Sequence, residues 1–298
     1  MPDHVRTLRT LPSTETVSWV CRSLGGARIL ASEFLPGGNS HANHALLVDG
    51  PVPYQVVLRR WVRPGWWVAD PDFTVEREVA ALALLERADV PAPRVIAADP
   101  TGEHGDAPAL LMTRLPGSSP DGRTACSPEF LPRLALAAAA IHRITRPWPG
   151  IPDYRPYNDL HHPCPPARSS RAWLWERAFT ALAGTAPAGQ EAFVHRDFHP
   201  DNTLWQGARL TGVVDWTTAS RGVAGVDLGH MRWNLVLDRG ERHADQFLTH
   251  YARVSEVDLG CQAYWDVRTV VDLLPDDGLT VAELALLEPY LARCLAEL

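Results

Sequence analysis

Histidine, aspartate and asparagine residues gather in one segment of the chain, 195–202. This segment contains the pattern His-x-Asp-x-x-x-x-Asn, whose fixed positions are His195, Asp197 and Asn202. A further aspartate, Asp215, follows thirteen residues after the asparagine, at the end of a short apolar segment. Carboxylate and amide oxygens are the ligands that Mg²⁺ prefers, and a separate carboxylate can orient a hydroxyl group for attack on a phosphorus atom. The residue types therefore suit a site that binds a hard metal ion and a hydroxyl group.

The two segments together resemble the catalytic and metal-binding loops of the protein-kinase-like superfamily. Pro-Asp-Asn at the end of the first segment, and Val-Asp-Trp at 214–216 in place of Asp-Phe-Gly, indicate its aminoglycoside phosphotransferase and choline kinase branch. The resemblance implies a small-molecule kinase in which Asp197 accepts the hydrogen bond of the acceptor hydroxyl. Asn202 and Asp215 then bind Mg²⁺, and His195 holds the catalytic loop together. The resemblance extends from about residue 30 to residue 235, and the remaining residues match only loosely.

A metal-dependent hydrolase is an alternative interpretation of the same segment. Four residues with imidazole or carboxylate groups alternate along it: His195, Asp197, His199 and Asp201. On an extended strand these groups would share one face and could form a metal cluster. However, Pro200 disrupts a regular strand, and this interpretation leaves the asparagine and the Val-Asp-Trp segment without a role.

A glycine-containing loop is the first of three features that the resemblance requires in the earlier part of the chain. Gly37, Gly38, Asn39 and Ser40 lie between two predicted strands, where glycine lets backbone N–H groups approach phosphate. The family has a similar Gly-Gly-x-x-Asn turn, and Asn43 matches its asparagine. We therefore expect the phosphates of ATP or GTP to bind this loop.

A phosphate-contacting cation is the second required feature, and here it is an arginine because the sequence contains no lysine. Family members commonly carry lysine on the third strand, where this chain has Arg59 and Arg60. Strand alternation places Arg59 on the same face as Val57 and Arg60 on the opposite face. In the superfamily, a small apolar residue two positions before the cation packs on the base, which favours Arg59 with Val57 and leaves Arg60 as the alternative.

Arginine at this position keeps the positive charge and can bind phosphate oxygens through two N–H groups. Its reach and geometry nevertheless differ from those of lysine. A protein that binds nucleotide or another ligand and has lost the transfer reaction is therefore a second interpretation of this sequence.

Glu78 is the third feature, a carboxylate that pairs with the cation. A helix is predicted over 74–85, and its apolar face includes Val75, Val79, Leu82 and Leu85. Glu78 falls on the same face, and a buried carboxylate is costly unless it is paired. We therefore expect an ion pair with Arg59; a glutamate that reaches water at the edge of this face is the alternative.

The nucleotide base is expected to bind the segment 110–117, which resembles the strand and hinge of the family. Met112, Thr113 and Leu115 are the candidate contacts, with backbone groups near 113–115 bonding the edge of adenine. The resemblance also includes Asp227 as a structural cap and His142 as a core residue on a helix.

The predicted elements give an α+β, bilobal layout, and the resemblance implies that it is a protein-kinase-like fold. Residues 1–115 are predicted as an N-lobe, an antiparallel sheet with one helix, with strands near 27–35, 45–48, 54–61 and 109–115. Residues 116–298 are predicted as a mainly helical C-lobe, with helices at 131–144 and 171–182 and short strands near 193–194 and 212–214. This C-lobe carries the catalytic loop, the metal site and the substrate-binding helices, and the nucleotide is expected in the cleft.

The phosphate acceptor is expected to bind the C-lobe. Residues 236–298 contain twelve acidic residues and five arginines, which would attract a cationic antibiotic, an amino alcohol or an amino sugar. Trp265 and Asp266 combine an aromatic face with a carboxylate, as suits an ammonium group, and His199 is a further candidate contact. The alternative is that the acidic helices are solvated surface and that Trp265 is part of the core.

Composition excludes several other classes of protein. The net charge is −7, so the basic footprint of a nucleic-acid-binding protein is absent. No apolar segment has the length of a membrane-spanning helix, and residues 1–16 are polar. The five cysteines are scattered without a Cys-x-x-Cys pair, which suits reduced thiols in a cytosol. We therefore expect a cytoplasmic enzyme whose partners are a nucleoside triphosphate, Mg²⁺ and a small hydroxyl acceptor.

Overall fold

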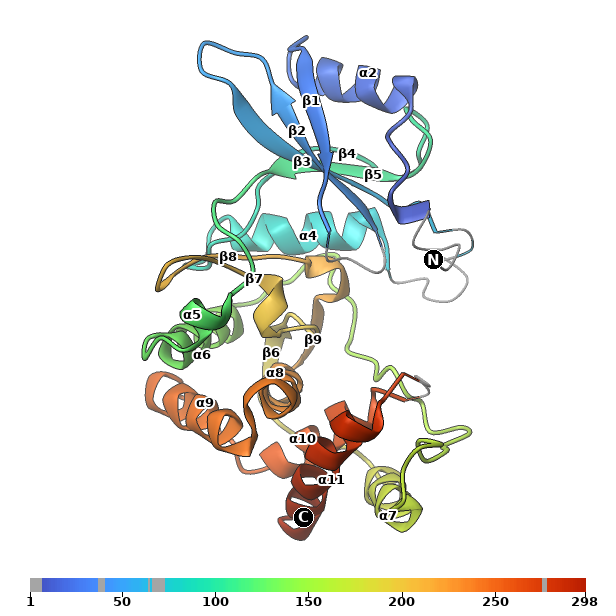
Figure 1. The fold of residues 1–298 in the computed structure, drawn as a ribbon, viewed down its shortest axis with the longest axis vertical. Helices are drawn as coiled ribbons and strands as arrows, with labels where there is room; N and C mark the ends of the chain where they lie inside the picture. Colours follow the sequence, from blue (N-terminus) through green and yellow to red (C-terminus); the bar gives the residue numbers. More distant parts are fainter. Residues whose placement is uncertain (1–6, 37–40, 64, 66–72, 275–277) are drawn as a thin grey trace. The chain divides into compact units, whose positions relative to one another are not determined.

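The computed structural model describes residues 7–36, 41–63, 65, 73–274 and 278–298 (Figure 1). The chain forms two compact units. The first contains Met1–Pro116, Pro149–Ile151 and Gly212–Thr218, and the second contains Gly117–Trp148, Pro152–Thr211 and Ala219–Leu298. An antiparallel sheet dominates the first unit and helices dominate the second, so the predicted α+β class is confirmed.

The sheet of the first unit has the strand order β1-β2-β3-β5-β4, and all neighbouring strands are antiparallel. Its strands are β1 (Ile29–Phe34), β2 (Ala42–Val48), β3 (Tyr54–Arg60), β4 (Val95–Asp99) and β5 (Ala109–Thr113). Four of them match predicted strands. The sequence analysis did not predict β4, a half-buried edge strand whose short apolar run lacks an alternating pattern.

Two helices cover opposite faces of this sheet (Figure 1). Helix α2 (Thr14–Ser23) begins at Ser13, whose side chain accepts the N–H of Thr16, and it contributes Trp19 and Val20 to a core with β2, β3 and β5. Helix α4 (Val75–Leu85) begins at Thr74, whose side chain accepts the N–H of Arg77. The prediction of a single helix in this part of the chain is therefore wrong, because α2 is a second one.

The second unit consists mainly of helices. These are α5 (Gly122–Ala125), α6 (Phe130–His142), α7 (Ala172–Leu182), α8 (Ala224–Arg239), α9 (Glu241–Val254), α10 (Gln262–Val271) and α11 (Val281–Ala296). Strand β6 (Glu191–Val194) pairs with β9 (Ser220–Val223), and β7 (Thr203–Gln206) pairs with β8 (Arg209–Val213). The 3-10 turns are η1 (Pro200–Asn202) and η2 (Trp216–Thr218), of which η2 belongs to the first unit. Within the described ranges, no helix combines the length and the apolar character that crossing a membrane requires.

Helix α8 packs closely against α10 because two of its residues are glycines. A Cβ atom added to Gly225 would lie 2.4 Å from the ring of Trp265, and one added to Gly229 would lie 2.7 Å from the carbonyl oxygen of the same tryptophan. Since real side chains do not tolerate such distances, glycine at both positions lets the two helices approach each other. This packing fixes α8, which carries several of the residues described below.

The buried side chain of His44 on β2 predicts an acid-sensitive fold. The ring packs edge-on against Phe34 at 5.8 Å, and burial, with the positive charge of Arg60, lowers the pKa of His44 to about 4. The unfolded chain binds this proton near pH 6.5. The folded protein therefore loses stability as the pH falls from about 6.5 to about 4.

We predict that His44→Leu reduces the fall in melting temperature between pH 7.5 and pH 5 relative to the unchanged protein. Other titrating groups contribute equally to both proteins, so the difference between the two pH profiles isolates His44. Thermal denaturation followed by circular dichroism measures this difference. Two parallel pH profiles would show that the protonation of His44 is not linked to folding.

Candidate functional site

The predicted catalytic loop connects β6 to η1 in the second unit. Its second residue, Arg196, has a φ angle of 70°, in the left-handed region that residues other than glycine rarely adopt. The backbone N–H groups of His195 and Arg196 both donate to the carboxylate of Asp227, at 2.8 and 2.6 Å. The guanidinium of Arg196 also stacks on the ring of Tyr157, at 3.9 Å from its centroid. These contacts hold a turn that the backbone alone would not favour.

Asp227 is completely buried and has a third partner, the Nε2 atom of His142 at 3.0 Å. The other ring nitrogen of His142 contacts the hydroxyl of Tyr251 at 2.8 Å. Burial would raise the pKa of Asp227, but the bonds from His142 and from the loop hold this pKa below its ordinary value. Asp227 therefore has the structural role expected of it: it caps the backbone N–H groups of the catalytic loop, whereas the N-cap of α8 is Val223.

Asp197 has a hydrogen-bond partner for each oxygen of its carboxylate. Asn202 Nδ2 lies 3.0 Å from Oδ2, and His230 Nε2 lies 3.1 Å from Oδ1. His199 Nε2 lies farther away, at 3.8 Å from Oδ2. Burial would raise the pKa of Asp197, but the hydrogen bond from His230 and the nearby histidines hold it well below the usual range. The carboxylate is therefore ionised at neutral pH, as a hydrogen-bond acceptor for a hydroxyl group must be.

Asn202 is oriented by two bonds from its Nδ2 atom, one to the carboxylate of Asp197 and one, at 2.9 Å, to the carbonyl oxygen of the same residue. Within the described part of the chain, its amide oxygen has no protein partner. An oriented amide oxygen of this kind is a suitable ligand for Mg²⁺.

Arg59 brings together three side chains in the first unit. Its Nη1 atom donates to Glu78 Oε1 at 2.8 Å and to Asp215 Oδ1 at 2.7 Å, and its Nε atom donates to Asn43 Oδ1 at 3.0 Å. The predicted ion pair with Glu78 is therefore present. The described residues provide no partner for Nη2, so this atom is available for a phosphate oxygen.

The cluster of Arg59, Glu78 and Asp215 contains two carboxylates and only one cation. Burial raises the pKa of Glu78 to about 7, although Arg59 opposes this effect. Burial would lower the pKa of Arg59, but Asp215 and Glu78 outweigh it and raise this pKa. The second carboxylate, Asp215, also accepts a bond from Thr217 Oγ1 at 3.0 Å and has a left-handed φ of 67°. Two carboxyl groups beside one cation, with their hard oxygen donors, fit a site that receives a divalent cation.

Arg60 lies on the opposite face of β3, where its side chain makes contacts that stabilise the fold. Its side chain is fully buried and contacts the carboxylate of Asp106 and the carbonyl oxygen of Thr10. Arg60 therefore contacts the N-terminal segment and not Glu78, which favours Arg59 over Arg60 as the cation.

The remaining residues predicted to bind the nucleotide are placed as follows. Gly37, Gly38, Asn39 and Ser40 lie outside the described residues. Val57 is on the face of β3 that carries Arg59, and Met112 is its register partner on β5. The N–H of Thr113 donates to the carbonyl oxygen of Arg94 at 2.9 Å and is not free for adenine, whereas Leu115 follows the end of β5.

The metal cluster of the alternative hydrolase is not formed. His195 is fully buried, whereas Asp201 lies exposed on η1. In the part of the chain that the structure describes, no group of three or more histidine, cysteine, aspartate and glutamate residues is arranged to hold a metal ion.

Trp265 and Asp266, predicted as contacts of a cationic acceptor, are both engaged in the interior of the second unit. Asp266 is 1% exposed, and its carboxylate pairs with Arg232 and accepts a bond from Gln262 at 2.9 Å. Trp265 packs edge-on against Tyr154 and Tyr264. The structure does not support these two assignments, and the alternative of a core tryptophan is correct.

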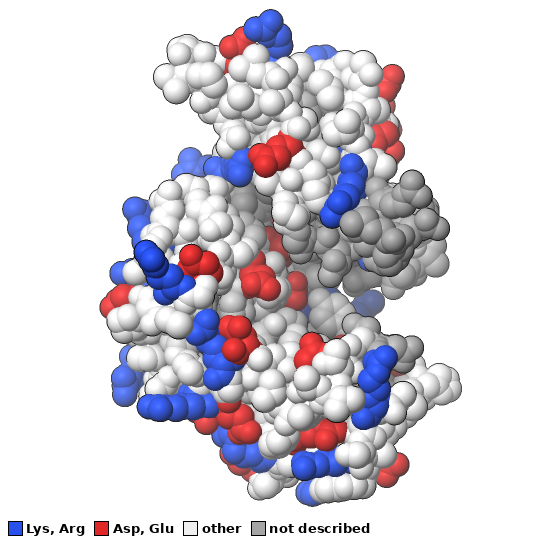
Figure 2. All heavy atoms as spheres, in the orientation of Figure 1, with Lys and Arg blue, Asp and Glu red and all other residues white. Residues whose placement is uncertain are grey.

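The acidic excess after residue 236 is partly neutralised by arginines. Arg293, for example, bonds Glu241 at 2.9 Å and Asp245 at 3.0 Å. Figure 2 shows acidic and arginine side chains interspersed over the face that it draws. The charges therefore give weaker support to a cationic acceptor than the sequence alone does.

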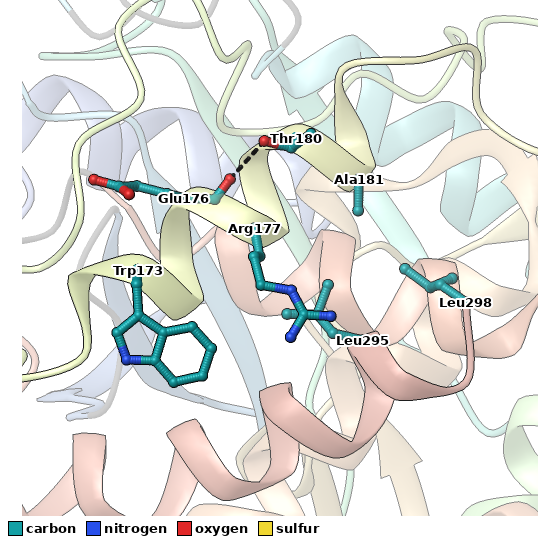
Figure 3. A pocket seen from close by; sticks show the side chains of 7 residues that line it. All are labelled: Trp173, Glu176, Arg177, Thr180, Ala181, Leu295 and Leu298. Carbon is teal, nitrogen blue, oxygen red and sulfur yellow. Dashed lines mark hydrogen bonds between the residues drawn. The ribbon is translucent and has the colours of Figure 1, made fainter.

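A surface pocket on α7 and α11 is separate from all of these residues (Figure 3). Its lining consists of Trp173, Glu176, Arg177, Thr180, Ala181, Leu295 and Leu298. Thr180 Oγ1 donates to the carbonyl oxygen of Glu176 within the same helix. The pocket combines one acid and one base with apolar side chains and adds no group to the predicted chemistry.

Comparison with known proteins places this fold among the phosphotransferases. The model of the phosphotransferase enzyme family matches residues 33–264, so the chain belongs to this family. The predicted relation to aminoglycoside phosphotransferases within the protein-kinase-like superfamily is thereby confirmed. No curated protein sequence matches the chain.

Solved structures with the same fold include three antibiotic-modifying enzymes. Aminoglycoside phosphotransferase APH(4)-Ia is 17% identical, with a TM-score of 0.65, over 95% of this chain and 98% of its own. Amicoumacin kinase hAmiN, in complex with AMP-PNP, Ca²⁺ and Ami, is 12% identical, with a TM-score of 0.62, over 100% of this chain and 96% of its own. An APH(2″) enzyme bound to GDP and kanamycin is 19% identical, with a TM-score of 0.63, over 96% of both chains. At these identities the likeness shows the fold alone.

We predict that Arg59→Gln and Arg60→Gln have different effects although the residues are adjacent. Arg59→Gln should weaken the binding of Mg²⁺-nucleotide by more than about tenfold, because it removes the cation that faces Glu78 and Asp215. Arg60→Gln should lower the melting temperature by roughly 5–10 °C while nucleotide affinity stays unchanged. Isothermal titration calorimetry and thermal denaturation measure the two effects. A larger loss of nucleotide affinity in Arg60→Gln would assign the cation to Arg60.

We also predict that Asp227→Asn disrupts the catalytic loop. Asparagine has nearly the same size, but it offers one acceptor oxygen and places an NH₂ group against the loop N–H groups. The substitution should destabilise the fold by about 2–4 kcal/mol, because donors that lose their charged partner stay buried. The matched control is Asp238→Asn on the same helix, where the carboxylate is 59% exposed. Chemical denaturation compares the two variants, and equal stabilities would contradict the assigned role of Asp227.

Proposed function

We propose that this protein is a kinase that transfers the γ-phosphoryl group of ATP or GTP to a hydroxyl group of a small molecule. Membership of the phosphotransferase family supports the reaction class. The observation that carries the proposal is the Asp197 carboxylate, which is ionised and held by a donor on each of its two oxygens.

Asp197 acts on the acceptor. Its carboxylate accepts the hydrogen bond of the acceptor hydroxyl and directs the oxygen lone pair at the γ-phosphorus. The new P–O bond forms as the bond from the γ-phosphorus to the β–γ bridging oxygen breaks. The hydroxyl proton passes to Asp197 and then to solvent, and the nucleoside diphosphate leaves.

Arg59 acts on the nucleotide. Its Nη2 atom contacts a phosphate oxygen, while Glu78 and Asn43 hold the guanidinium in place. Asn202 and Asp215 would supply oxygen ligands for Mg²⁺, whose charge would neutralise that of the transferred phosphate. Val57, Met112 and the backbone at Leu115 contact the base.

The acceptor is proposed to be an antibiotic or an amino-alcohol or sugar metabolite with a free hydroxyl. Solved structures of the same fold include enzymes bound to amicoumacin and to kanamycin, which supports this class of compound. His199, whose ring is near Asp197, is the proposed acceptor contact of this chain. Trp265 and Asp266 are excluded from this role because both are buried in other contacts.

A nucleotide-binding protein without transfer activity is the second interpretation, and it depends on arginine in place of lysine. Arg59 nevertheless makes the ion pair with a helix glutamate that the kinase fold requires of a lysine. A protein that only binds nucleotide also has no need for the oriented Asp197. We therefore favour the kinase.

We predict that purified protein with Mg²⁺-ATP or Mg²⁺-GTP adds one phosphate to a member of a pooled library of aminoglycosides, other antibiotics, amino alcohols and sugars. Asp197→Ala should lower this rate by about a hundredfold or more while nucleotide affinity is retained. Asp215→Ala should instead weaken the binding of Mg²⁺-nucleotide by more than about tenfold. Mass spectrometry of the pool and calorimetry with the nucleotide measure these effects.

Transfer at the normal rate by Asp197→Ala would remove this residue from the mechanism. Nucleotide binding without any phosphorylated product, tested with both nucleotides and the whole pool, would favour the binding protein. Unchanged nucleotide binding by Asp215→Ala would place the metal ligand elsewhere.

A further inference from the structure

His230 is a partner of Asp197 that the sequence motifs do not include. Its Nε2 atom lies 3.1 Å from Asp197 Oδ1, whereas Asn202 Nδ2 lies 3.0 Å from Oδ2. The two donors come from different elements, α8 and η1. A carboxylate with a donor on each oxygen cannot rotate about its Cβ–Cγ bond without breaking one hydrogen bond. The plane of the Asp197 carboxylate is therefore fixed from two sides.

The position of His230 on α8 connects it to Asp227. The two residues are three positions apart, so they lie on the same face of the helix. Asp227 holds the backbone N–H groups of His195 and Arg196, and His230 holds the side chain of the next residue. One helix face thus sets both the path of the loop and the orientation of its carboxylate.

The ring of His230 is itself held in place. Trp233 packs edge-on against it, with ring centroids 4.9 Å apart. The side chain of His230 is 13% exposed, which is less than that of Asp197 at 33%. His199, by contrast, comes no closer than 3.8 Å to the carboxylate, beyond normal hydrogen-bond distance. His230 is therefore the histidine that bonds Asp197.

We propose that His230 is a positioning residue for phosphoryl transfer, whose Nε2–H fixes Asp197 Oδ1 so that the remaining lone pairs of the carboxylate meet the acceptor hydroxyl. This inference rests on the proposed kinase function. Each carboxylate oxygen has two lone pairs, and His230 and Asn202 occupy one on each oxygen. His230 acts only through Asp197, because a small error in the angle of this carboxylate misdirects the hydroxyl.

The kinetic test compares His230→Leu with His230→Gln, using Mg²⁺-ATP and the acceptor found in the pooled library. Leucine cannot donate a hydrogen bond, whereas glutamine places an N–H at a similar distance from the backbone. We expect His230→Leu to lower kcat by about tenfold to a hundredfold with an unchanged KM for Mg²⁺-ATP. His230→Gln should recover most of this loss.

Two controls separate positioning from stability. The melting temperatures of the leucine and glutamine variants should be similar, so that their different kcat values cannot reflect the fold. His243→Leu, on α9 and bonded to the carbonyl oxygen of Arg239, should retain the kcat of the unchanged protein. Equal kcat values for the unchanged protein and His230→Leu would overturn the proposal, as would a glutamine variant no better than the leucine variant.

A second measurement does not depend on the acceptor. In protein labelled with ¹⁵N-histidine, the ring signal of His230 is identified by its loss in His230→Gln. We expect the Nε2 signal of His230 to shift in Asp197→Ala, while that of His243 stays in place. An unshifted His230 signal would overturn the proposal even if transfer is observed.

The two measurements distinguish failure of this inference from failure of the proposed function. If Asp197→Ala transfers phosphate normally, or if the unchanged protein transfers none, the kinase function fails and the positioning role fails with it. If Asp197→Ala is inactive but His230→Leu is fully active, only the role of His230 fails.

Discussion

The hydrogen bonds of the Asp227 carboxylate are the interaction on which the catalytic loop of the second unit depends. A single buried side chain accepts bonds from the N–H groups of His195 and Arg196 and from His142. Arg196 lies in a backbone region that is unfavourable for any residue with a side chain, at a cost of about 1–3 kcal/mol. Charge-assisted hydrogen bonds offset this cost. This anchor holds the turn that comes directly before Asp197.

The first unit also contains a turn with an unfavourable backbone angle, and there a buried cation, in place of an anion, bonds the turn. Asp215 also has a left-handed backbone, and the guanidinium of Arg59 joins it to Glu78. A lysine has one ammonium group, whereas arginine reaches Asn43 through Nε and both carboxylates through Nη1. The arginine therefore serves as a structural connection between β3, α4 and the turn at Asp215, in addition to its charge.

Much of the fold and the centre of the site could be predicted because they follow local rules. Strand alternation separated Arg59 from Arg60, and helical periodicity placed Glu78 on the buried face of α4. Helix α2 was not predicted because its residues are on average polar and only three of them are buried. His230 could not be found from spacing along the motif, because its contact with Asp197 depends on the packing of α8. Its one local clue is the three-residue interval from Asp227.

The absence of lysine has a chemical consequence beyond phosphate binding. The side chains of this sequence offer no primary amine, because every cationic residue other than histidine is an arginine. A guanidinium stays protonated at physiological pH and is a much weaker nucleophile than an amine. Acylating nucleotide analogues that label the strand lysine of kinases would leave Arg59 unmodified. Amine-directed reagents would therefore modify none of the side chains of this sequence, whereas dicarbonyl reagents, which condense with guanidinium groups, suit Arg59.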